Sequence, residues 1–477
     1  MLKKGVIFIV ATALFADYFL LSVVIPILPH VFVNGGFSKT SLGLLFASKP
    51  LAQIFGNLFM GSCVDTRGPK PMLLLNSLVL LGSTGMFVYG LKYFTNDLSS
   101  AFKVLIVARS IQGISSSGIM ASGMALVANY HQERVHGTAM GMAVTGIAAG
   151  VVLGPPVGGI MASLLGNCSP FYIITGIISV NILCQIHFYC KSSQYAHTEI
   201  NRSSSINASP SDGFGTSIVD EESGRQLSFN SIEEKEKQKH DAVAERSHDC
   251  SSYPCCSLFA LFTYRRIAVV ALGNLLGNFC VGMMEVLIPL YLMSEFNLSQ
   301  LYQGLVFGAM SFSYLFATPI SGMLSDRFAK WKVFIAGPVI GGLGLLLFYW
   351  STTLTLVIVC LCIVGVGVAL IDTPSMSLLS AVAMMENLDN LGSVYALQDF
   401  CVCIGFLFGP LVATNVEYHV FAEKSSPFRY TALCCGALLL AYTPLVLMLR
   451  GIKEEREKSD SDVAIKEDDL ASLLMSN

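Results

Sequence analysis

Asp17 is an ionisable residue in the middle of an apolar stretch, Gly5 to Pro29, that holds no other charge. A helix of that length can cross a bilayer at about 1.5 Å rise per residue. A carboxylate at such depth costs free energy to insert, so it is usually retained for function. Buried carboxylates can bind a cation or carry protons, which is the chemistry of a membrane transporter. Four further ionisable residues lie in other apolar stretches: Lys49, Glu285, Asp372 and Asp399.

The composition indicates a multi-pass membrane protein. Hydrophobic residues make up 53% and charged residues 13% of the 477 positions. This charged share is about half that of a soluble domain. The mean hydropathy is +0.63. The formal net charge is −3 and the Lys and Arg residues form no basic face, so no nucleic-acid partner is expected.

The sequence argues against an enzyme. It shows no metal-ligand cluster, no nucleophile–base pair in a supporting context, and no Gly-x-x-x-x-Gly-Lys phosphate loop for ATP. We therefore expect no metal and no cofactor, and a transport cycle driven by a proton gradient across the lipid bilayer.

Twelve membrane spans are predicted from apolar segments of sufficient length. Residues 192–263 are rich in Ser, Glu and Lys and lack periodic apolar positions, so they are predicted to be a disordered linker. The linker separates a six-helix bundle over 1–191 from a second one over 264–450, and a cytosolic tail follows over 451–477. The predicted spans are 5–29, 41–60, 72–91, 102–129, 138–164, 169–190, 266–293, 303–324, 333–350, 354–385, 392–416 and 428–449.

Basic residues in the short loops fall on one side of the predicted spans, together with Lys3 and Lys4. Lys and Arg are enriched in cytosolic loops, so both termini are predicted to lie in the cytosol. The first apolar run lacks a small-residue cleavage site and is predicted to be a retained span.

Two motifs recur in the two halves. Residues 61–68 follow the second span and read Gly-Ser-Cys-Val-Asp-Thr-Arg-Gly, while residues 322–327 follow the eighth and read Gly-Met-Leu-Ser-Asp-Arg. Residues 150–155 in the fifth span and 405–410 in the eleventh both follow the pattern Gly-x-x-x-Gly-Pro. The predicted fold is therefore an all-α membrane protein of two six-helix bundles related by pseudo-two-fold symmetry. Alternating-access transporters have this architecture, with the substrate site between the repeats near the midplane.

These motifs resemble those of the major facilitator superfamily. Residues 61–68 are similar to its signature after the second span, and residues 109–113 to its Arg-x-x-Gln-Gly element. The resemblance implies the 12-helix major facilitator fold. The fifth-span pattern resembles that of proton antiporters and is carried here by Gly150, Gly154, Pro155, Gly158 and Gly159.

A closer resemblance is to the vesicular amine transporter family, the monoamine and acetylcholine carriers of secretory vesicles. Residues 30–41 are shorter than the luminal loop of those carriers and lack its Cys, so polyamine-carrying relatives and drug exporters stay open as alternatives. The similar segments are residues 17–29, 44–49, 278–289, 313–315, 371–376 and 392–399.

Asp17 is expected to bind the ammonium group of a protonated amine. A desolvated carboxylate attracts a cation, neighbouring aromatic groups strengthen that attraction, and the resemblance implies the same role. The alternative is a carboxyl group satisfied by helix hydroxyls or kept protonated.

The resemblance also implies an ion pair between Lys49 and Asp399, which protonation of Asp399 would open. A purely structural pair is the alternative there.

Glu285 and Asp372, together with Asp399, are the expected proton carriers, because burial disfavours the charged form of a carboxyl group. Glu285 or Asp372 could instead contact the substrate, and Asp372 could serve to cap a helix kink beside Pro374. Three further residues are expected to line the cavity, with packing as the alternative: Asn278, Tyr314 and Tyr395.

Arg109 is expected to be a structural or switching group bonded to helix carbonyls.

Two acid–base pairs are predicted to act as latches, that is, to hold the cytosolic face closed. A carboxylate near a helix N-terminus with an Arg partner forms contacts that break when this face opens. The pairs are Asp65 with Arg67, and Asp326 with Arg327.

The tail contains an acidic dileucine pattern of the type [DE]-x-x-x-L-L, formed by Asp469, Leu473 and Leu474. Such a motif in a cytosolic tail predicts adaptor binding and sorting to a vesicle membrane.

Together these features predict a proton-coupled antiporter. It would move a cationic amine of the monoamine, acetylcholine or polyamine type from the cytosol into acidic secretory or synaptic vesicles. One alternative is a plasma-membrane organic-cation or multidrug proton antiporter. The other is a membrane receptor or scaffold on a transporter fold, for which five intramembrane charges would be an unneeded cost.

Overall fold

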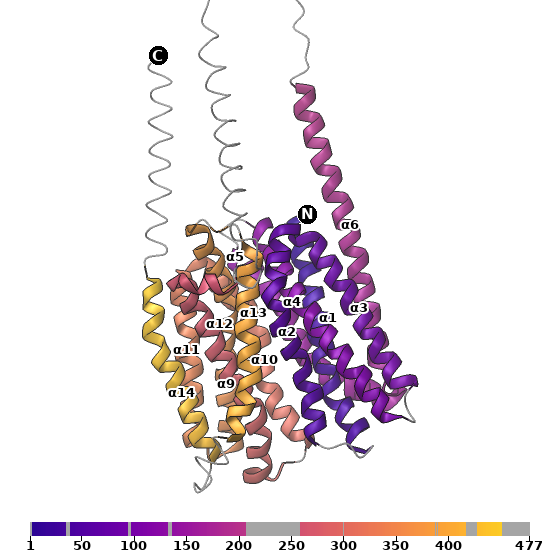
Figure 1. Ribbon diagram of the computed structural model, residues 1–477. Helices are drawn as coiled ribbons and strands as arrows, with labels where there is room; N and C mark the ends of the chain where they lie inside the picture. The colour runs from indigo at the N-terminus through magenta and orange to yellow at the C-terminus, as the bar shows by residue number, and fades with distance from the viewer. Residues whose placement is uncertain are drawn as a thin grey trace, which may run out of the picture.

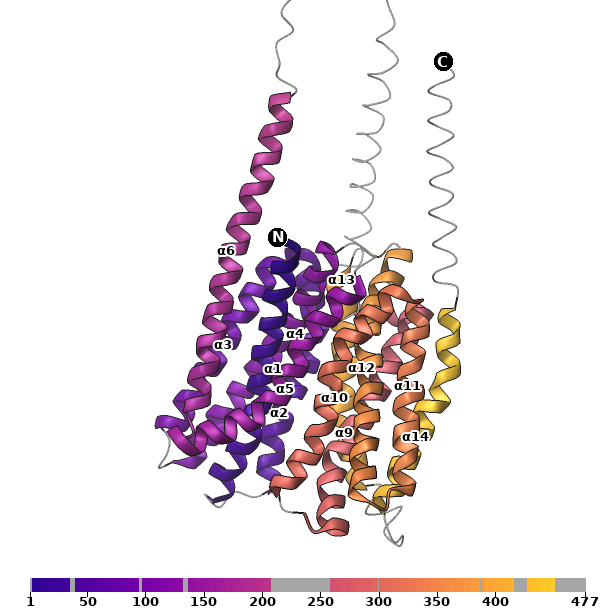
Figure 2. The same cartoon turned by 180° about the vertical axis from the view of Figure 1, so that it is seen from behind.

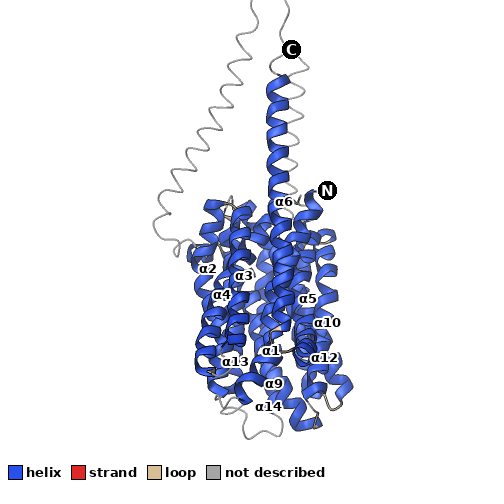
Figure 3. Ribbon diagram, turned by 90° about the vertical axis from the view of Figure 1, so that its right-hand side faces the viewer, coloured by secondary structure: helices blue, strands red, loops and turns tan. Residues whose placement is uncertain are grey.

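The computed structural model describes residues 2–34, 39–93, 97–131, 136–206, 258–298, 300–386, 388, 390–415 and 427–450. Within these ranges the regular structure is entirely helical (Figure 3). Twelve α-helices are present there: α1 Leu2–Asn34, α2 Lys39–Arg67, α3 Pro69–Tyr93, α4 Leu98–Tyr130, α5 His136–Leu165, α6 Ser169–Ile206, α9 Arg265–Phe296, α10 Gln300–Arg327, α11 Lys330–Leu347, α12 Leu354–Met385, α13 Leu391–Asn415 and α14 Pro427–Val446.

Each predicted span coincides with one of these helices. By length and composition, 10 of them are apolar enough to cross a membrane. The other two, α2 and α10, carry more polar side chains, such as the buried Gln53 and Asn57 of α2. Both helices pack across the molecule, α2 on α13 and α10 on α5. A helix that faces protein rather than lipid can satisfy polar side chains, which explains their lower hydropathy.

The two halves of the chain form two bundles that lie side by side. Helices α1–α6 occupy one side and α9–α14 the other (Figures 1 and 2). Helix α1 begins and α14 ends on the same face of the molecule, which we call the termini face. The ends of α2 and α10 and the starts of α5 and α13 reach this same face.

Glycines bring α5 against α1 and α13 against α9. A Cβ atom on Gly150 would lie 2.8 Å from the carbonyl oxygen of Phe15, and one on Gly405 would lie 2.7 Å from the backbone nitrogen of Phe279. Ser22 of α1 donates a hydrogen bond of 2.9 Å to the carbonyl oxygen of Gly150. Small residues of this kind permit close approach of helices within a membrane. The face of α5 toward α1 also includes Gly154 and Gly158, whereas Pro155 is inside the helix and Gly159 is half-buried.

Replacing Gly154 by Leu is expected to destabilise the N-terminal bundle. A Cβ atom at Gly154 would already lie 2.9 Å from Cβ of Ser22, so a larger side chain must push α1 away from α5. Overpacking of this kind costs about 1–3 kcal/mol. Thermal unfolding in detergent measures the loss. Gly85→Leu is the control, because a Cβ atom at Gly85 meets nothing within 4 Å; equal melting temperatures for the two variants would refute the packing role.

Helix α6 differs from its predicted length. Its predicted span ends at residue 190, but the helix continues to Ile206, into the segment predicted to be a linker. The extension projects beyond the bundle on the termini face (Figure 1). The rest of the predicted linker up to residue 257, and the sorting residues Asp469, Leu473 and Leu474, lie outside the described residues.

Candidate functional site

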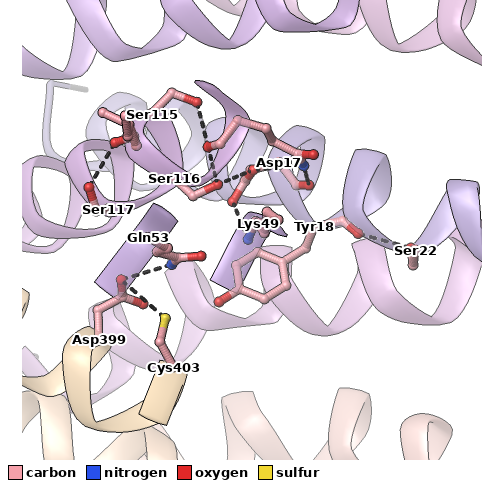
Figure 4. A network of polar contacts seen from close by, with 12 residues as sticks. Asp17, Tyr18, Ser22, Lys49, Gln53, Ser115, Ser116, Ser117, Asp399 and Cys403 are labelled. Carbon is pink, nitrogen blue, oxygen red and sulfur yellow. Dashed lines mark hydrogen bonds and ion pairs between the residues drawn. The ribbon is translucent and has the colours of Figure 1, made fainter. Parts of the chain in front are cut away.

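Asp17 lies at the meeting point of α1, α2 and α4. Its Oδ1 accepts hydrogen bonds from Ser116 Oγ at 2.6 Å and from Gln112 Nε2 at 3.4 Å. Its Oδ2 is 3.7 Å from Lys49 Nζ, and this ion pair is buried, with Asp17 1% and Lys49 2% exposed (Figure 4). The ammonium of Lys49 also lies 5.3 Å from the centroid of the Tyr18 ring. Asp17 is therefore ordered by two neutral donors and one cation.

The ion pair of Lys49 differs from the predicted one. Asp399 was the expected partner, but its Oδ2 accepts a hydrogen bond of 2.8 Å from Gln53 Nε2 (Figure 4). It accepts a second one, also of 2.8 Å, from Asn57 Nδ2. The physical reason lies in α2. Lys49, Gln53 and Asn57 follow one another at four-residue intervals, so they form a row along one helix face. The first member of the row meets Asp17 of α1, and the other two meet Asp399 of α13.

Asp399 joins the two halves of the protein. It belongs to α13, whereas its amide donors belong to α2. Its carboxyl group is fully buried, at 0% exposure. Among the described residues, Asp399 Oδ1 and Asn57 Oδ1 have no hydrogen-bond partner. Lys49 and Asp17 are the charged groups that act on it across the interface. Asp399 is thus held by neutral donors, with a cation nearby that is paired elsewhere.

Asp372 forms a second acidic site, in the C-terminal half. Its Oδ1 accepts a hydrogen bond of 3.3 Å from Asn278 Nδ2 of α9, and its Oδ2 accepts one of 3.2 Å from the Tyr314 hydroxyl of α10. Asp372 is half-buried. Asp372 was predicted as a proton carrier, and Asn278 and Tyr314 as cavity-lining residues; the structure brings the three together. The carboxylate meets neutral donors only, and no ion pair to it is found among the described residues.

Glu285 and Tyr395 occupy different surroundings. Glu285 lies seven residues after Asn278, which places both on the same face of α9. It is exposed, and no ion pair to it is found in the described part of the chain.

Tyr395 was predicted to line the cavity, but its side chain is 0% exposed and belongs to the apolar core. Tyr395 lies one turn before Asp399 on α13 and packs in the core, which is the alternative given for it above.

Arg109 acts on Asp17 through a neighbour. Its Nη1 donates a hydrogen bond of 3.2 Å to Gln112 Oε1, and Gln112 in turn donates to Asp17. The guanidinium lies 5.6 Å from the centroid of the Phe46 ring. The predicted bonds to helix carbonyls are replaced in the described residues by this side-chain contact. Arg109 therefore orients the amide that supports Asp17.

Two carboxylates cap helix N-termini of the opposite half at the termini face. Asp65 Oδ1 accepts from the backbone N–H of Gly392 at 2.6 Å, and Oδ2 from that of Ser393 at 2.9 Å. Asp326 likewise accepts from Gly137 N–H at 2.6 Å and Thr138 N–H at 2.7 Å, and from the Thr138 hydroxyl. The positive end of a helix dipole favours a carboxylate at such a place. α13 and α5 are therefore each tied to the other half.

The Arg partners predicted for these latches are not engaged. Arg67 and Arg327 are exposed, and neither forms an ion pair within the described ranges. The first-turn amides of α5 and α13 already fill the carboxylate oxygens, so the guanidinium groups gain more from water than from a second partner. Each latch thus consists of a carboxylate and a helix N-terminus.

The two latches yield a direct prediction for amide exchange. Asp326→Ala is expected to lower the protection of the Gly137 and Thr138 amides by about 10-fold or more, since each amide loses an acceptor worth about 1.5–3 kcal/mol. Hydrogen–deuterium exchange with mass spectrometry measures this. Asp65→Ala is the matched variant and should affect Gly392 and Ser393 instead. Protection that falls at neither site, or equally at both sites in both variants, would contradict independent latches.

The described acidic residues of the centre are not arranged as a metal site. Among the described residues, no group of three or more His, Cys, Asp and Glu side chains is arranged to hold a metal ion. The polar centre of the molecule is formed by carboxylates, amides, hydroxyls and two buried cations.

Ionisable groups buried between two six-helix halves define a membrane transporter, and sequence comparison specifies which kind. The family model of the Major Facilitator Superfamily matches residues 10–226 and 270–474. The chain belongs to this superfamily.

Among curated proteins, the chain is similar to vesicular carriers. It is 24% identical to the synaptic vesicular amine transporter of Rattus norvegicus over 423 residues, which cover 88% of this chain and 68% of that protein. It is 25% identical to the chromaffin granule amine transporter of Rattus norvegicus, covering 87% and 67%. It is 24% identical to the probable vesicular acetylcholine transporter-B of Danio rerio, covering 98% and 83%.

A solved structure supports the fold alone. The human organic anion transporter MFSD10 (TETRAN) superposes with a TM-score of 0.66 at 17% identity, covering 93% of this chain and 99% of that one.

Proposed function

We propose that this protein is a proton-coupled antiporter that moves a cationic amine of the monoamine, acetylcholine or polyamine type from the cytosol into acidic vesicles. The observation that carries the proposal is the excess of acids at the centre. Three carboxylates lie there buried or half-buried, and a fourth is exposed on the α9 face that carries Asn278. With two buried cations among the described residues, two negative charges are left to balance. The acids are Asp17, Glu285, Asp372 and Asp399, and the cations are Lys49 and Arg109.

A charge deficit of this kind supports exchange. An unpaired charge in a low-dielectric interior is costly, so the centre takes up cations from either side. An ammonium ion and a proton can satisfy it, and so can two protons. Because both compete for the same carboxylates, protons entering from an acidic lumen displace the amine. Each pH unit of gradient supplies about 1.4 kcal/mol per proton.

Asp372 offers the first contact for the amine in this arrangement. Its carboxylate is met only by the neutral donors Asn278 and Tyr314, and Tyr314 adds an aromatic ring. A cation beside a carboxylate and an aromatic face gains from both. Glu285, exposed on the Asn278 face of α9, supplies a second acid for the proton or the ammonium.

Asp17 becomes available to the amine when Lys49 leaves it. We propose that Lys49 pairs alternately with Asp17, as here, and with Asp399, whose Oδ1 has no partner among the described residues. Protonation of Asp399 would return Lys49 to Asp17 and expel the amine. Such an exchange links proton binding to the contact between α2 and α13, which belong to different halves.

The direction of transport follows from the basic loops. These lie on the termini face, which is taken as cytosolic by the positive-inside rule. Both latches are formed on that face, which supports assigning this conformation to the state closed to the cytosol. The printed names of the relatives, which are vesicular amine and acetylcholine transporters, support a vesicle membrane as the site of action.

Uptake into proteoliposomes with an acidic interior tests the proposal. Radiolabelled amines of the three types are offered with and without a protonophore. Concentrative uptake of at least one amine, abolished by the protonophore, is the expected result. Uptake indifferent to the protonophore would refute antiport.

Replacing Leu473 and Leu474 by Ala should redirect the protein to the plasma membrane. If the unchanged protein and the variant are both found at the plasma membrane, the result would favour a multidrug exporter and argue against adaptor binding.

A further inference from the structure

Three helices of the C-terminal half meet on one buried hydroxyl group. Gln398 Nε2 of α13 donates a hydrogen bond of 2.8 Å to Ser375 Oγ of α12. The Ser375 hydroxyl is 2.6 Å from the carbonyl oxygen of Asp372 and 3.2 Å from Asn274 Oδ1 of α9. Ser375, Gln398 and Asn274 are all fully or almost fully buried. The three helices pack against one another (Figure 1).

We propose that Ser375 and Gln398 are positioning residues that couple Asp372 to Asp399 through a buried amide–hydroxyl link. The inference rests on the proposed function in treating these two carboxyl groups as parts of one transport cycle. Neither Ser375 nor Gln398 is placed in contact with the amine.

The link begins at Asp372, in the C-terminal half, and ends beside Asp399, at the interface between the two halves. On α12 the acceptor of the Ser375 hydroxyl is the main chain of Asp372 itself. On α13 the donor is Gln398, the residue directly before Asp399. On α9 the third partner, Asn274, lies one turn from Asn278, whose amide donates to Asp372. The Asp372 turn is therefore fixed to α13 through Ser375 and Gln398, and to α9 through Asn274 and Asn278.

The backbone of α12 is weakened where the link is made. Pro374 is inside α12 and has no N–H, so the carbonyl of Leu370 loses its helical partner. The neighbouring Thr373 Oγ1 is buried with no hydrogen-bond partner among the described residues. A segment with an interrupted hydrogen-bond ladder can shift more easily than a regular helix. The Gln398–Ser375 bond supplies the restraint that the backbone lacks, and a shift at Asp372 is passed on to α13.

The composition of the link argues against a role in stability alone. Gln398 Oε1 is buried and has no hydrogen-bond partner in the described part of the chain. A buried amide satisfied on one side only is less favourable than an apolar side chain of equal size. Leu or Met at this position would pack at no such cost. The amide of Gln398 is explained if the contact between α12 and α13 transmits a movement of one helix to the other.

The two acids that the link joins have defined electrostatic neighbours. The phenol of Tyr314 faces Asp372, and Glu285 lies farther along the α9 face that carries Asn278. Around Asp399 the titratable or charged groups are Lys49 of α2, Asp17 and Tyr18 of α1, and Cys401 and Cys403 of α13. None of these bridges the two acids through a hydrogen bond that the structure gives, so the Ser375–Gln398 route is the one to test.

Infrared titration of the purified full-length protein tests the coupling without any substrate. The carboxyl band of Asp399 is assigned by its loss in Asp399→Asn, and its midpoint pH is measured with and without Asp372→Asn. We expect Asp372→Asn to move this midpoint by about half a pH unit or more, as for directly coupled sites. The same change made in a Gln398→Met background is expected to move it by less than about a third of that amount. Met keeps the length of Gln and removes the amide.

Two further variants serve as an independent test and as a control. Ser375→Ala removes the central hydroxyl and should reproduce Gln398→Met, which keeps the test decisive if one of the two fails to fold. Ser377→Ala is the control, because its buried hydroxyl bonds only to the Pro374 carbonyl of its own helix among the described residues. It should leave the coupling intact.

An equal midpoint shift in the wild-type and Gln398→Met backgrounds would overturn the proposal, as would no shift in the wild-type background. In proteoliposomes, Gln398→Met should also move the pH profile of amine uptake while Ser377→Ala does not. Because the infrared result needs no amine, failure of the proposed transport activity would show separately, as absent uptake by the wild-type protein.

Discussion

Replacing Asp17 by Asn is expected to reduce amine uptake by at least about 100-fold, because loss of one partner of a buried charge pair costs about 2–5 kcal/mol of binding free energy. The variant leaves Lys49 in the interior without its counter-ion and removes the carboxylate that the amine would claim when Lys49 departs. Folding should survive, since the Asn side-chain oxygen still accepts the hydrogen bond from Ser116. Uptake into acidified proteoliposomes, with the melting temperature measured in parallel, gives both quantities.

Glu295→Gln is the matched control for this variant. Glu295 is an exposed acid at the end of α9, two residues before the left-handed Asn297, and takes no part in the central cluster. Its uptake should stay within about two-fold of the wild type, as expected for a surface substitution. Wild-type transport by Asp17→Asn would remove Asp17 from the site. A large drop in melting temperature together with lost uptake would instead assign it a structural role.

Much of the architecture could be predicted from the sequence because bilayer thickness constrains it. Apolar segments long enough to span lipid have to be helices, and the repeated Gly-x-x-x-Asp and Gly-x-x-x-Gly-Pro motifs mark equivalent places in two halves. Asp372, Asn278 and Tyr314 were each singled out from the sequence, but the contacts among them were not predicted. α6 is the exception, since its continuation to Ile206 lies outside the apolar segment that signals a span.

The pairing of side chains was harder to predict, for a physical reason. Which acid receives Lys49 depends on how far α2 is shifted along α1 and α13, and hydrophobic periodicity does not determine that shift. Gln53 and Asn57 were missed because neutral amides are common in helices. Their spacing of four and eight residues from Lys49 was the available signal. For Tyr395 the sequence left core packing open as the alternative, because an aromatic residue gives the same pattern in a core as in a cavity wall.

The latches illustrate the same limit. The acids Asp65 and Asp326 were recognised from their motifs, and a helix N-terminus was predicted beside them. Their Arg neighbours in sequence suggested ion pairs, but the structure satisfies each carboxylate with backbone amides from the other half. A donor supplied by a distant helix cannot be identified from local spacing. Contacts between the two halves are therefore the part of the site that local sequence patterns do not predict.

Exchange of Lys49 between two acids has a consequence for conformation that can be measured directly. Asp17→Asn and Asp399→Asn should shift the termini face in opposite directions, each by about 10-fold in population for a coupling of about 1.4 kcal/mol. Lys49 pairs with Asp17 while the latches are closed, so losing Asp17 favours the open face and losing Asp399 favours the closed one. Spin labels at the exposed Thr66 and Phe328, introduced as unnatural amino acids, report the distance across the face.

Lys49→Met provides the decisive comparison for this exchange. Without the cation there is no counter-ion to move, so adding Asp17→Asn or Asp399→Asn to Lys49→Met should change the distance distribution much less than either does alone. For the same reason a double replacement of Lys49 and Asp399 by Ala should impair uptake less than Asp399→Ala, because no buried cation is left without its second partner. Shifts of the same sign for the two acid variants, or shifts that persist unchanged in the Lys49→Met background, would show that Lys49 stays with Asp17 throughout the cycle. The ion pair would then be a fixed support of the N-terminal bundle, and proton binding at Asp399 would have to reach α2 through Gln53 and Asn57 instead.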